Sequence, residues 1–123
     1  MRREHSKLEL FQKLELKDYD DDIINSTISK LAEQNYQSDN RFAEAFIVMR
    51  FNQGKGPIKI ASELKMRGIS SYDLSDFDWF KSAKEIRKKK FGDSSSIDFK
   101  EQAKQKRFLQ SRGFSLDQIN KAF

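Results

Sequence analysis

The chain has 123 residues and a mass of 14.5 kDa, the length of one ordinary domain, and 37% of its residues are hydrophobic and 35% charged. The absence of cysteine excludes a disulfide framework and a thiolate metal site, and no apolar run approaches the roughly 18 residues of a membrane span. We therefore expect one soluble, cytoplasmic domain covering residues 1–123, with the 11 phenylalanines as anchors of its core.

The net charge of +5 is unevenly distributed. Residues 1–40 carry 6 Lys and Arg against 9 Asp and Glu, whereas residues 41–123 carry 18 against 10. A basic C-terminal two-thirds suggests an anionic partner, either nucleic acid or an acidic protein surface. On charge alone, an ordinary solvated surface is an equally good interpretation.

Apolar residues recur at helical spacing along nearly the whole chain, and no stretch alternates like a half-buried strand. This pattern predicts an all-α fold of short helices. The apolar rows, in chain order, are Leu8, Phe11 and Leu14; Ile24, Ile28 and Leu31; Phe42, Phe46 and Met49; Ile58, Ala61 and Leu64; and Trp79, Ala83 and Ile86.

Residues that begin and end helices agree with these rows. Asp39 is placed to cap the run that begins at Phe42, and Pro57 suits a first helical turn. Gly68 and Gly113 stand where helices should stop.

A repeat appears when the segments that end in glycine are superposed. Two copies share Leu, two residues, Arg-Gly, an apolar residue, Ser, and an aliphatic residue four positions later, and a looser third copy has Asp18 in place of the glycine. Such a period is typical of helical repeats. The copies are "LELKDYDDDII" at 14–24, "LKMRGISSYDL" at 64–74 and "LQSRGFSLDQI" at 109–119, and the expected repeats are 1–36, 37–78 and 79–123.

The "QGKGP" segment at residues 53–57 has neither the spacing nor the hydroxyl of a Walker phosphate loop, and no strand is predicted before it. We interpret it as a tight turn between helices, in which Gly54 and Gly56 supply unusual backbone angles and Pro57 starts the next helix.

The stretch from Asp39 to Ser70 resembles the central signature of the bacterial RecX family, regulators of the recombinase RecA. The residues that match the family pattern are Asp39, Arg41, Phe42, Ala43, Arg50, Gly54, Gly56, Pro57, Ile60, Leu64, Gly68 and Ile69. The resemblance implies three tandem three-helix repeats, similar to helix-turn-helix units, in an elongated curved molecule. Met1 stands almost upon the family's "REHS" stretch, so a first repeat without its first helix is expected.

The resemblance also implies a function. It predicts a protein without enzymatic activity that binds the RecA filament on single-stranded DNA and inhibits its ATPase, strand-exchange and coprotease activities, and so modulates DNA repair, recombination and the SOS response. No catalytic residue, cofactor, metal, small-molecule substrate or membrane is expected. The alternative is a nucleic-acid-binding protein of helix-turn-helix-like units, and weak direct DNA binding is compatible with either.

The sequence offers little for catalysis or metal binding. His5 is the only histidine and lies in a charged leader, which favours a solvated side chain over a base or ligand. The acidic run at residues 18–22 lacks the spacing of an EF-hand. We interpret its carboxylates as the favourable start of a helix, near the positive end of the helix dipole.

Two rows of basic residues in the third repeat each share one helical face. The first lies opposite Trp79, Ala83 and Ile86, and the second lies away from Phe99 and Ala103. Each is either a partner-binding surface or the solvated side of an amphipathic helix. The rows are Lys81, Lys84 and Lys88, and Lys100, Lys104 and Arg107.

A second candidate patch lies in the second repeat, where Lys59 is expected opposite Ala61 and Leu64, and Arg50 and Lys55 flank the turn. The full set of candidate partner-binding residues is Arg41, Arg50, Lys55, Lys59, Arg67, Lys81, Lys84, Lys88, Lys100, Lys104 and Arg107.

Phe108 lies on the helical wheel nearly opposite Phe99 and beside basic residues. It could stack on a nucleic-acid base or fill a pocket on a partner. Packing against the neighbouring repeat is the favoured interpretation.

Overall fold

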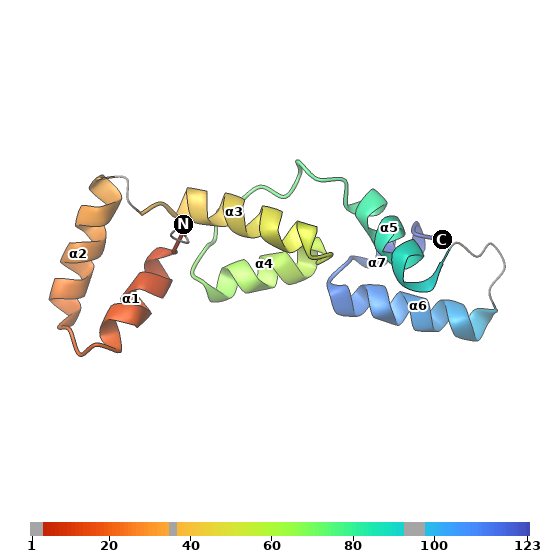
Figure 1. The fold of residues 1–123 in the computed structure, drawn as a ribbon, viewed down its shortest axis with the longest axis horizontal. Helices are drawn as coiled ribbons and strands as arrows, with labels where there is room; N and C mark the ends of the chain where they lie inside the picture. Colours follow the sequence, from red (N-terminus) through yellow and green to blue (C-terminus); the bar gives the residue numbers. More distant parts are fainter. Residues whose placement is uncertain (1–3, 35–36, 93–97) are drawn as a thin grey trace. The chain divides into compact units, whose positions relative to one another are not determined.

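The computed structural model describes residues 4–34, 37–92 and 98–123, and within these ranges it contains helices and no strand. This confirms the predicted all-α class. The helices are α1 (Lys7–Glu15), α2 (Asp21–Glu33), α3 (Asp39–Asn52), α4 (Pro57–Met66), α5 (Trp79–Phe91), α6 (Phe99–Arg112) and α7 (Leu116–Asn120), as Figure 1 shows.

The chain divides into two compact units, each with its own core, and two of the boundaries fall within α3 and α4. The first unit contains Met1–Ile47 and Glu63–Tyr72, and the second contains Val48–Ser62 and Asp73–Phe123. The buried apolar residues of the first unit are Ile24, Ile28, Phe42, Ala43, Phe46, Ile47, Leu64 and Ile69. Those of the second unit are Ile60, Trp79, Ala83, Leu109, Phe114, Ile119 and Ala122.

One backbone feature is common to all three repeats. Asp18, Gly68 and Gly113, which follow α1, α4 and α6, have φ angles of 61°, 78° and 98°. This left-handed conformation commonly ends helices, and aspartate tolerates it better than most residues that have a side chain. The predicted stops at Gly68 and Gly113 are confirmed, and the loose third copy of the repeat has the same turn.

The second and third repeats differ after this turn. In the third repeat, Ser115 and Gln118 form a reciprocal capping box that begins α7. The equivalent of Gln118 in the second repeat is Asp73, and its shorter side chain accepts hydrogen bonds from the hydroxyl and the N–H of Ser75. These two bonds lower the pKa of Asp73. The turn competes with helix formation, and residues 69–78 contain no helix.

The turn between α3 and α4 is partly as predicted. Pro57 is the first residue of α4, and Gly54 has a φ of +80°. Gly56 does not have a positive φ, so the prediction of an unusual angle there is wrong. Glycine is required at this position for space, because a Cβ atom on Gly56 would lie 2.4 Å from the carbonyl carbon of Gly113. The Gly56 N–H donates to the Arg112 carbonyl at 2.7 Å.

Some residues of the predicted apolar rows lie outside the core. On α4 the buried residues are Ile60 and Leu64, whereas Ile58 is 56% exposed. The apolar residues of α4 can be aligned on one helical face at a spacing of three residues, as predicted, or of four. In the structure the buried pair has the spacing of four. Met49 and Phe99 are also exposed, so the expected apolar face of α6 does not include Phe99.

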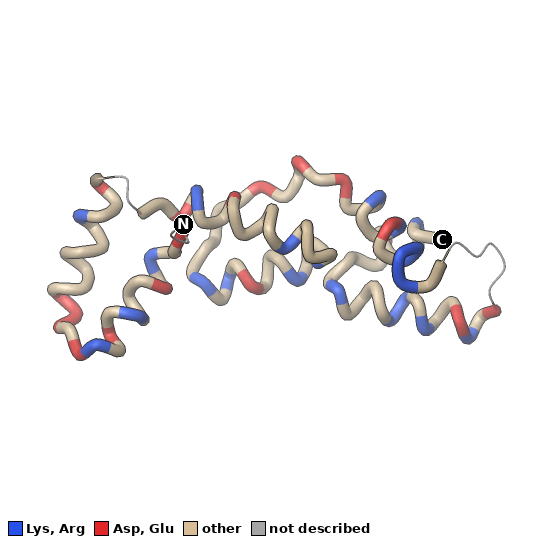
Figure 2. The backbone as a smooth tube through the Cα atoms, viewed as in Figure 1, with Lys and Arg blue, Asp and Glu red and all other residues tan. Residues whose placement is uncertain are grey.

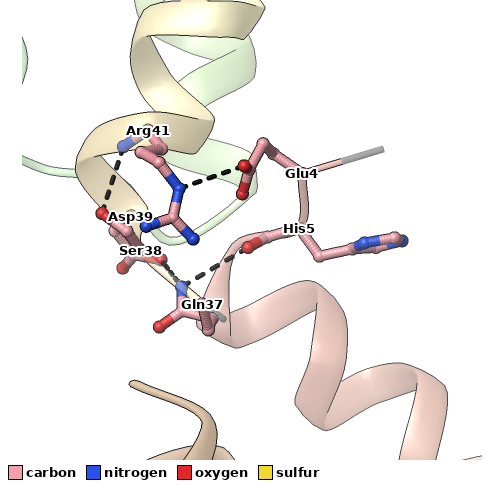
Figure 3. A network of polar contacts seen from close by, with 6 residues as sticks. All are labelled: Glu4, His5, Gln37, Ser38, Asp39 and Arg41. Atoms are coloured by element: carbon pink, nitrogen blue, oxygen red, sulfur yellow. Dashed lines mark hydrogen bonds and ion pairs between the residues drawn. The ribbon is translucent and has the colours of Figure 1, made fainter. Parts of the chain in front are cut away.

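Asp39 does not cap its own helix as predicted. The hydroxyl of Ser38 accepts the Arg41 N–H at 3.2 Å and occupies the cap position of α3. The Asp39 carboxylate instead accepts the N–H of Lys7, the first residue of α1, at 2.9 Å, and the side-chain N–H of Gln37 at 2.8 Å. Asp39, which begins α3, therefore provides an acceptor for a backbone N–H at the start of α1. Its hydrogen bond with Gln37 belongs to the network in Figure 3.

This contact leads to a prediction about the attachment of α1. Asp39→Ala is expected to destabilise α1 by about 1 kcal/mol, because the Lys7 N–H loses its acceptor. Amide hydrogen exchange should accelerate in α1 and remain unchanged in α6. The matched variant Asp39→Asn keeps an acceptor oxygen and should retain most of the protection. Equal protection of α1 in the wild type and Asp39→Ala would show that the bond has no role.

Candidate functional site

The basic row on α5 is only partly available to a partner. Lys81 and Lys84 are exposed, as predicted, but Lys88 is half-buried. The Lys81 ammonium lies 3.9 Å from a carboxylate oxygen of Glu85, one helical turn away. Lys84 is therefore the member of this row that is exposed and outside this ion pair.

Arg87 lies on the same helix and is buried, with 4% of its surface exposed. Its Nε donates to the Ala122 carbonyl at 2.7 Å and its Nη1 to Gln105 Oε1 at 3.3 Å. Its guanidinium also lies over the Phe123 ring, 4.7 Å from the centroid. Sequence reasoning missed this role, although Arg87 continues the buried i, i+4 row of α5.

The row on α6 has the geometry that the sequence predicts. Lys100, Lys104 and Arg107 are all exposed, while Gln105 and Leu109 form the buried side of the helix. Among the described residues, none of the three cations forms an ion pair. Figure 2 shows basic residues spaced along α6 and gathered at the last turn of α5.

The candidate patch in the second repeat is less exposed than predicted. Arg50 Nη1 donates to Gln53 Oε1 at 2.8 Å, and the Lys55 N–H donates to the Arg50 carbonyl at 3.0 Å. Lys59 is half-buried, with its backbone packed against Gly113. Lys59 is therefore less accessible to a partner than expected, because Gly113 packs against it.

Two further candidate residues in the first unit hold the fold together. Arg41 Nε lies 3.0 Å from Glu4 Oε1, an ion pair drawn in Figure 3. The guanidinium of Arg67 lies 4.7 Å from the centroid of the Phe46 ring, and its Nε lies 3.8 Å from Glu9 Oε2. Both arginines thus have intramolecular partners.

The acidic and histidine residues behave as structural groups. Asp21 and Asp22 lie in the first turn of α2, which confirms their interpretation as helix-opening carboxylates. The His5 carbonyl accepts from Gln37, while its imidazole points away from the network in Figure 3. In the part of the chain that the structure describes, no group of three or more His, Cys, Asp or Glu residues is arranged to hold a metal. No described helix is long and apolar enough to cross a membrane.

The second unit contains a pocket of about 540 Å³ that sequence reasoning did not predict. Phe108 lines it and meets Phe91 edge to face, with ring centroids 5.3 Å apart. The ring contacts of Phe108, with Phe91, Lys90 and Arg112, are all within its own repeat, and it shares the pocket lining with residues 51–54 of the second repeat, so the favoured packing against the neighbouring repeat is not what these contacts show. The lining residues are Phe51, Asn52, Gln53, Gly54, Ser82, Glu85, Ile86, Lys89, Lys90, Phe108 and Arg112.

The chain matches models of one known protein family over most of its length. Models of the first, second and third three-helix domains of RecX match residues 1–31, 38–76 and 76–123. The chain belongs to the RecX family. Two relatives are named Regulatory protein RecX: that of Halorhodospira halophila is 36% identical to this chain, and that of Acinetobacter baylyi is 40% identical. Each alignment covers 98% of this chain and 79% of the relative.

A solved structure of the RecX family also matches the fold. The crystal structure of RecX from Lactobacillus salivarius aligns with a TM-score of 0.81 and 25% identity, covering 98% of this chain and 84% of that one. This likeness extends the family assignment from sequence to three-dimensional structure.

The structure explains several residues of the RecX signature by their intramolecular contacts. Asp39 caps α1, Arg41 pairs with Glu4, and Gly56 allows the approach of Gly113. These residues hold the fold in this chain. The exposed basic residues of α6 and most of the pocket lining lie outside the signature.

Proposed function

We propose that this chain is a non-enzymatic regulator that binds the RecA filament on single-stranded DNA. It inhibits the ATPase, strand-exchange and coprotease activities of RecA in the cytoplasm, and so modulates recombinational repair and the SOS response. Support comes from the three RecX domain matches and from the relatives named Regulatory protein RecX.

The observation that carries the binding mode is the exposed row Lys100, Lys104 and Arg107 on α6. Cations that lack an intramolecular ion pair are available to acidic groups on a partner. A polymer presents the same acidic groups repeatedly, so contacts that are weak one by one gain from a high effective concentration. Lys84 on α5, together with Arg50 and Lys55, is proposed as a secondary contact.

The test is the triple variant Lys100→Glu, Lys104→Glu and Arg107→Glu. We expect it to abolish inhibition of the ATPase of a preformed RecA filament, at an unchanged melting temperature, because exposed substitutions usually change stability by only about 0.5 kcal/mol. The matched control reverses three exposed lysines of the first unit, Lys13, Lys17 and Lys30, and should still inhibit. Equal inhibition by both folded triples would contradict the proposed role of α6.

Nucleic-acid binding is the second candidate function, since an exposed row of cations also suits a phosphate backbone. Under this alternative, the α6 triple variant should bind single-stranded DNA more weakly. The salt dependence of that affinity should flatten by about 0.7 log units for each phosphate that the variant no longer neutralises. A DNA affinity that is unaffected while inhibition disappears favours the filament.

A further inference from the structure

The pocket of the second unit is lined by both apolar and basic residues. Phe51 from α3, Ile86 from α5 and Phe108 from α6 supply apolar lining, and Lys89, Lys90 and Arg112 supply three cations. A volume of about 540 Å³ lies in the range of sites that enclose a small ligand or a few side chains.

Two of the three cations, Lys90 and Arg112, contact the same aromatic ring. The Lys90 ammonium lies 5.5 Å and the Arg112 guanidinium 5.3 Å from the centroid of Phe108. Such contacts fix charged side chains that would otherwise move freely in solvent. The edge of Phe91 packs against the same ring at 88°, so Phe108 is itself fixed.

The net charge at the pocket favours an anionic ligand. Glu85 is the one acidic residue of the lining, and its carboxylate already pairs with Lys81 outside the pocket. Among the described residues, no carboxylate forms an ion pair with Lys89, Lys90 or Arg112. The three cations of the lining therefore carry positive charge that no described carboxylate neutralises, next to apolar lining residues.

We propose that this pocket receives one bulky apolar side chain from an acidic protein segment, with the flanking carboxylates on Lys89, Lys90 and Arg112. The proposal rests on the proposed function for the protein that carries the segment, namely a subunit of the RecA filament. An apolar anchor in a pocket supplies affinity, and the charge pairs around it supply orientation and a faster encounter.

The same observations weigh against a nucleic-acid occupant. A phosphate backbone needs a row of cations but no apolar cavity. Stacking of a base needs an open aromatic face, whereas Phe108 is already approached by two cations and by Phe91.

The direct test uses a synthetic probe, the peptide acetyl-Glu-Asp-Phe-Asp-Glu-amide, titrated into the ¹⁵N-labelled full chain. We expect saturable shifts of the amides of Gln53, Gly54, Ile86 and Arg112. The same peptide with alanine for phenylalanine should bind at least tenfold more weakly. Equal binding of both peptides would overturn the proposal, as would an oligo(dT) that shifts the same amides at lower concentration than the phenylalanine peptide.

Two variants separate the cavity from its charge. Asn52→Trp places an indole at the pocket edge without changing the charge, and Lys89→Glu with Lys90→Glu reverses the charge of two lining cations. Both variants should bind the phenylalanine peptide at least tenfold more weakly than the wild type does. Both should also bind the RecA filament more weakly. The control Lys30→Glu with Lys65→Glu carries the same charge change on exposed residues and should bind like the wild type.

The outcomes distinguish this proposal from the proposed function. If the wild type neither binds nor inhibits the RecA filament, the proposed function fails, and the peptide titration alone decides whether the pocket takes an acidic segment. If the wild type inhibits and both folded pocket variants inhibit equally well, the pocket proposal is wrong while the proposed function stands.

Discussion

Gly56→Val is expected to lower the free energy of unfolding of the second unit by about 3 kcal/mol. The new side chain would meet the backbone of Gly113 and Phe114, and its Cβ alone would lie 2.4–2.5 Å from three of their atoms. Backbone cannot rotate aside as a side chain does, so the α3–α4 turn and the end of α6 must separate. The hydrogen bonds from Gly56 to Arg112 and from Ile58 to Gly113 would be strained with them.

Urea denaturation followed by Trp79 fluorescence measures this effect, because the single tryptophan lies in the core of the second unit. Gly92→Ala is the matched control. Gly92 has a φ of 84° and a ψ of 175°, a region essentially restricted to glycine, and no neighbour within 4 Å of an added Cβ, so backbone strain of about 2 kcal/mol without any overlap of atoms is expected there. A Gly56→Val midpoint equal to that of the wild type would show that the two turns do not touch in solution.

Arg87→Ala is expected to cost the second unit about 3 kcal/mol. The substitution removes the donors to the Ala122 carbonyl and to Gln105, both in residues that are at most 3% exposed, and it leaves a space beneath Phe123. A buried acceptor without a partner loses its hydration without compensation. The same Trp79 fluorescence measures the destabilisation.

Two matched variants identify the cause. Arg87→Lys keeps the charge but lacks the planar fork that reaches both acceptors, so it should recover only part of the stability. Arg107→Ala removes an exposed arginine of the same repeat and should change stability by no more than about 0.5 kcal/mol. If Arg87→Ala is as stable as Arg107→Ala, Arg87 is not a structural residue.

The fold was largely predictable because its signals are local. Apolar spacing indicated the helices, and the glycine of each Arg-Gly pair indicated their left-handed ends at Gly68 and Gly113. The looser copy could be aligned because aspartate tolerates the same conformation at Asp18. The three superposed segments supplied the repeat count, and the resemblance to the RecX family supplied the three-helix composition of each repeat.

The less predictable features depend on residues far apart in the chain. The role of Asp39 requires Lys7, 32 positions away, and the burial of Arg87 requires the Ala122 carbonyl, 35 positions away. From the sequence alone, an arginine is expected to be an exposed charge. Arg41, Arg67 and Arg87 instead have specific intramolecular partners. The set of candidate cations was therefore too broad.

The candidate site was also predictable only where its residues lie on a single helix. The exposed row Lys100, Lys104 and Arg107 follows from helical spacing alone and was predicted. The pocket was not, because its apolar residues Phe51 and Phe108 come from helices that meet only in the folded unit. No single segment carries its pattern. The division into three repeats at 36 and 78 stays a proposal.

The contact between Gly56 and Gly113 has a consequence for synthesis of the chain on the ribosome. The first unit is complete once Tyr72 has emerged, whereas the turn after α3 cannot find its partner until Gly113 has been made. Domains fold in the order of their emergence when their contacts permit it. We therefore expect a nascent chain that folds its N-terminal unit first, carries an open α3–α4 turn until Gly113 has emerged, and closes the second unit only then.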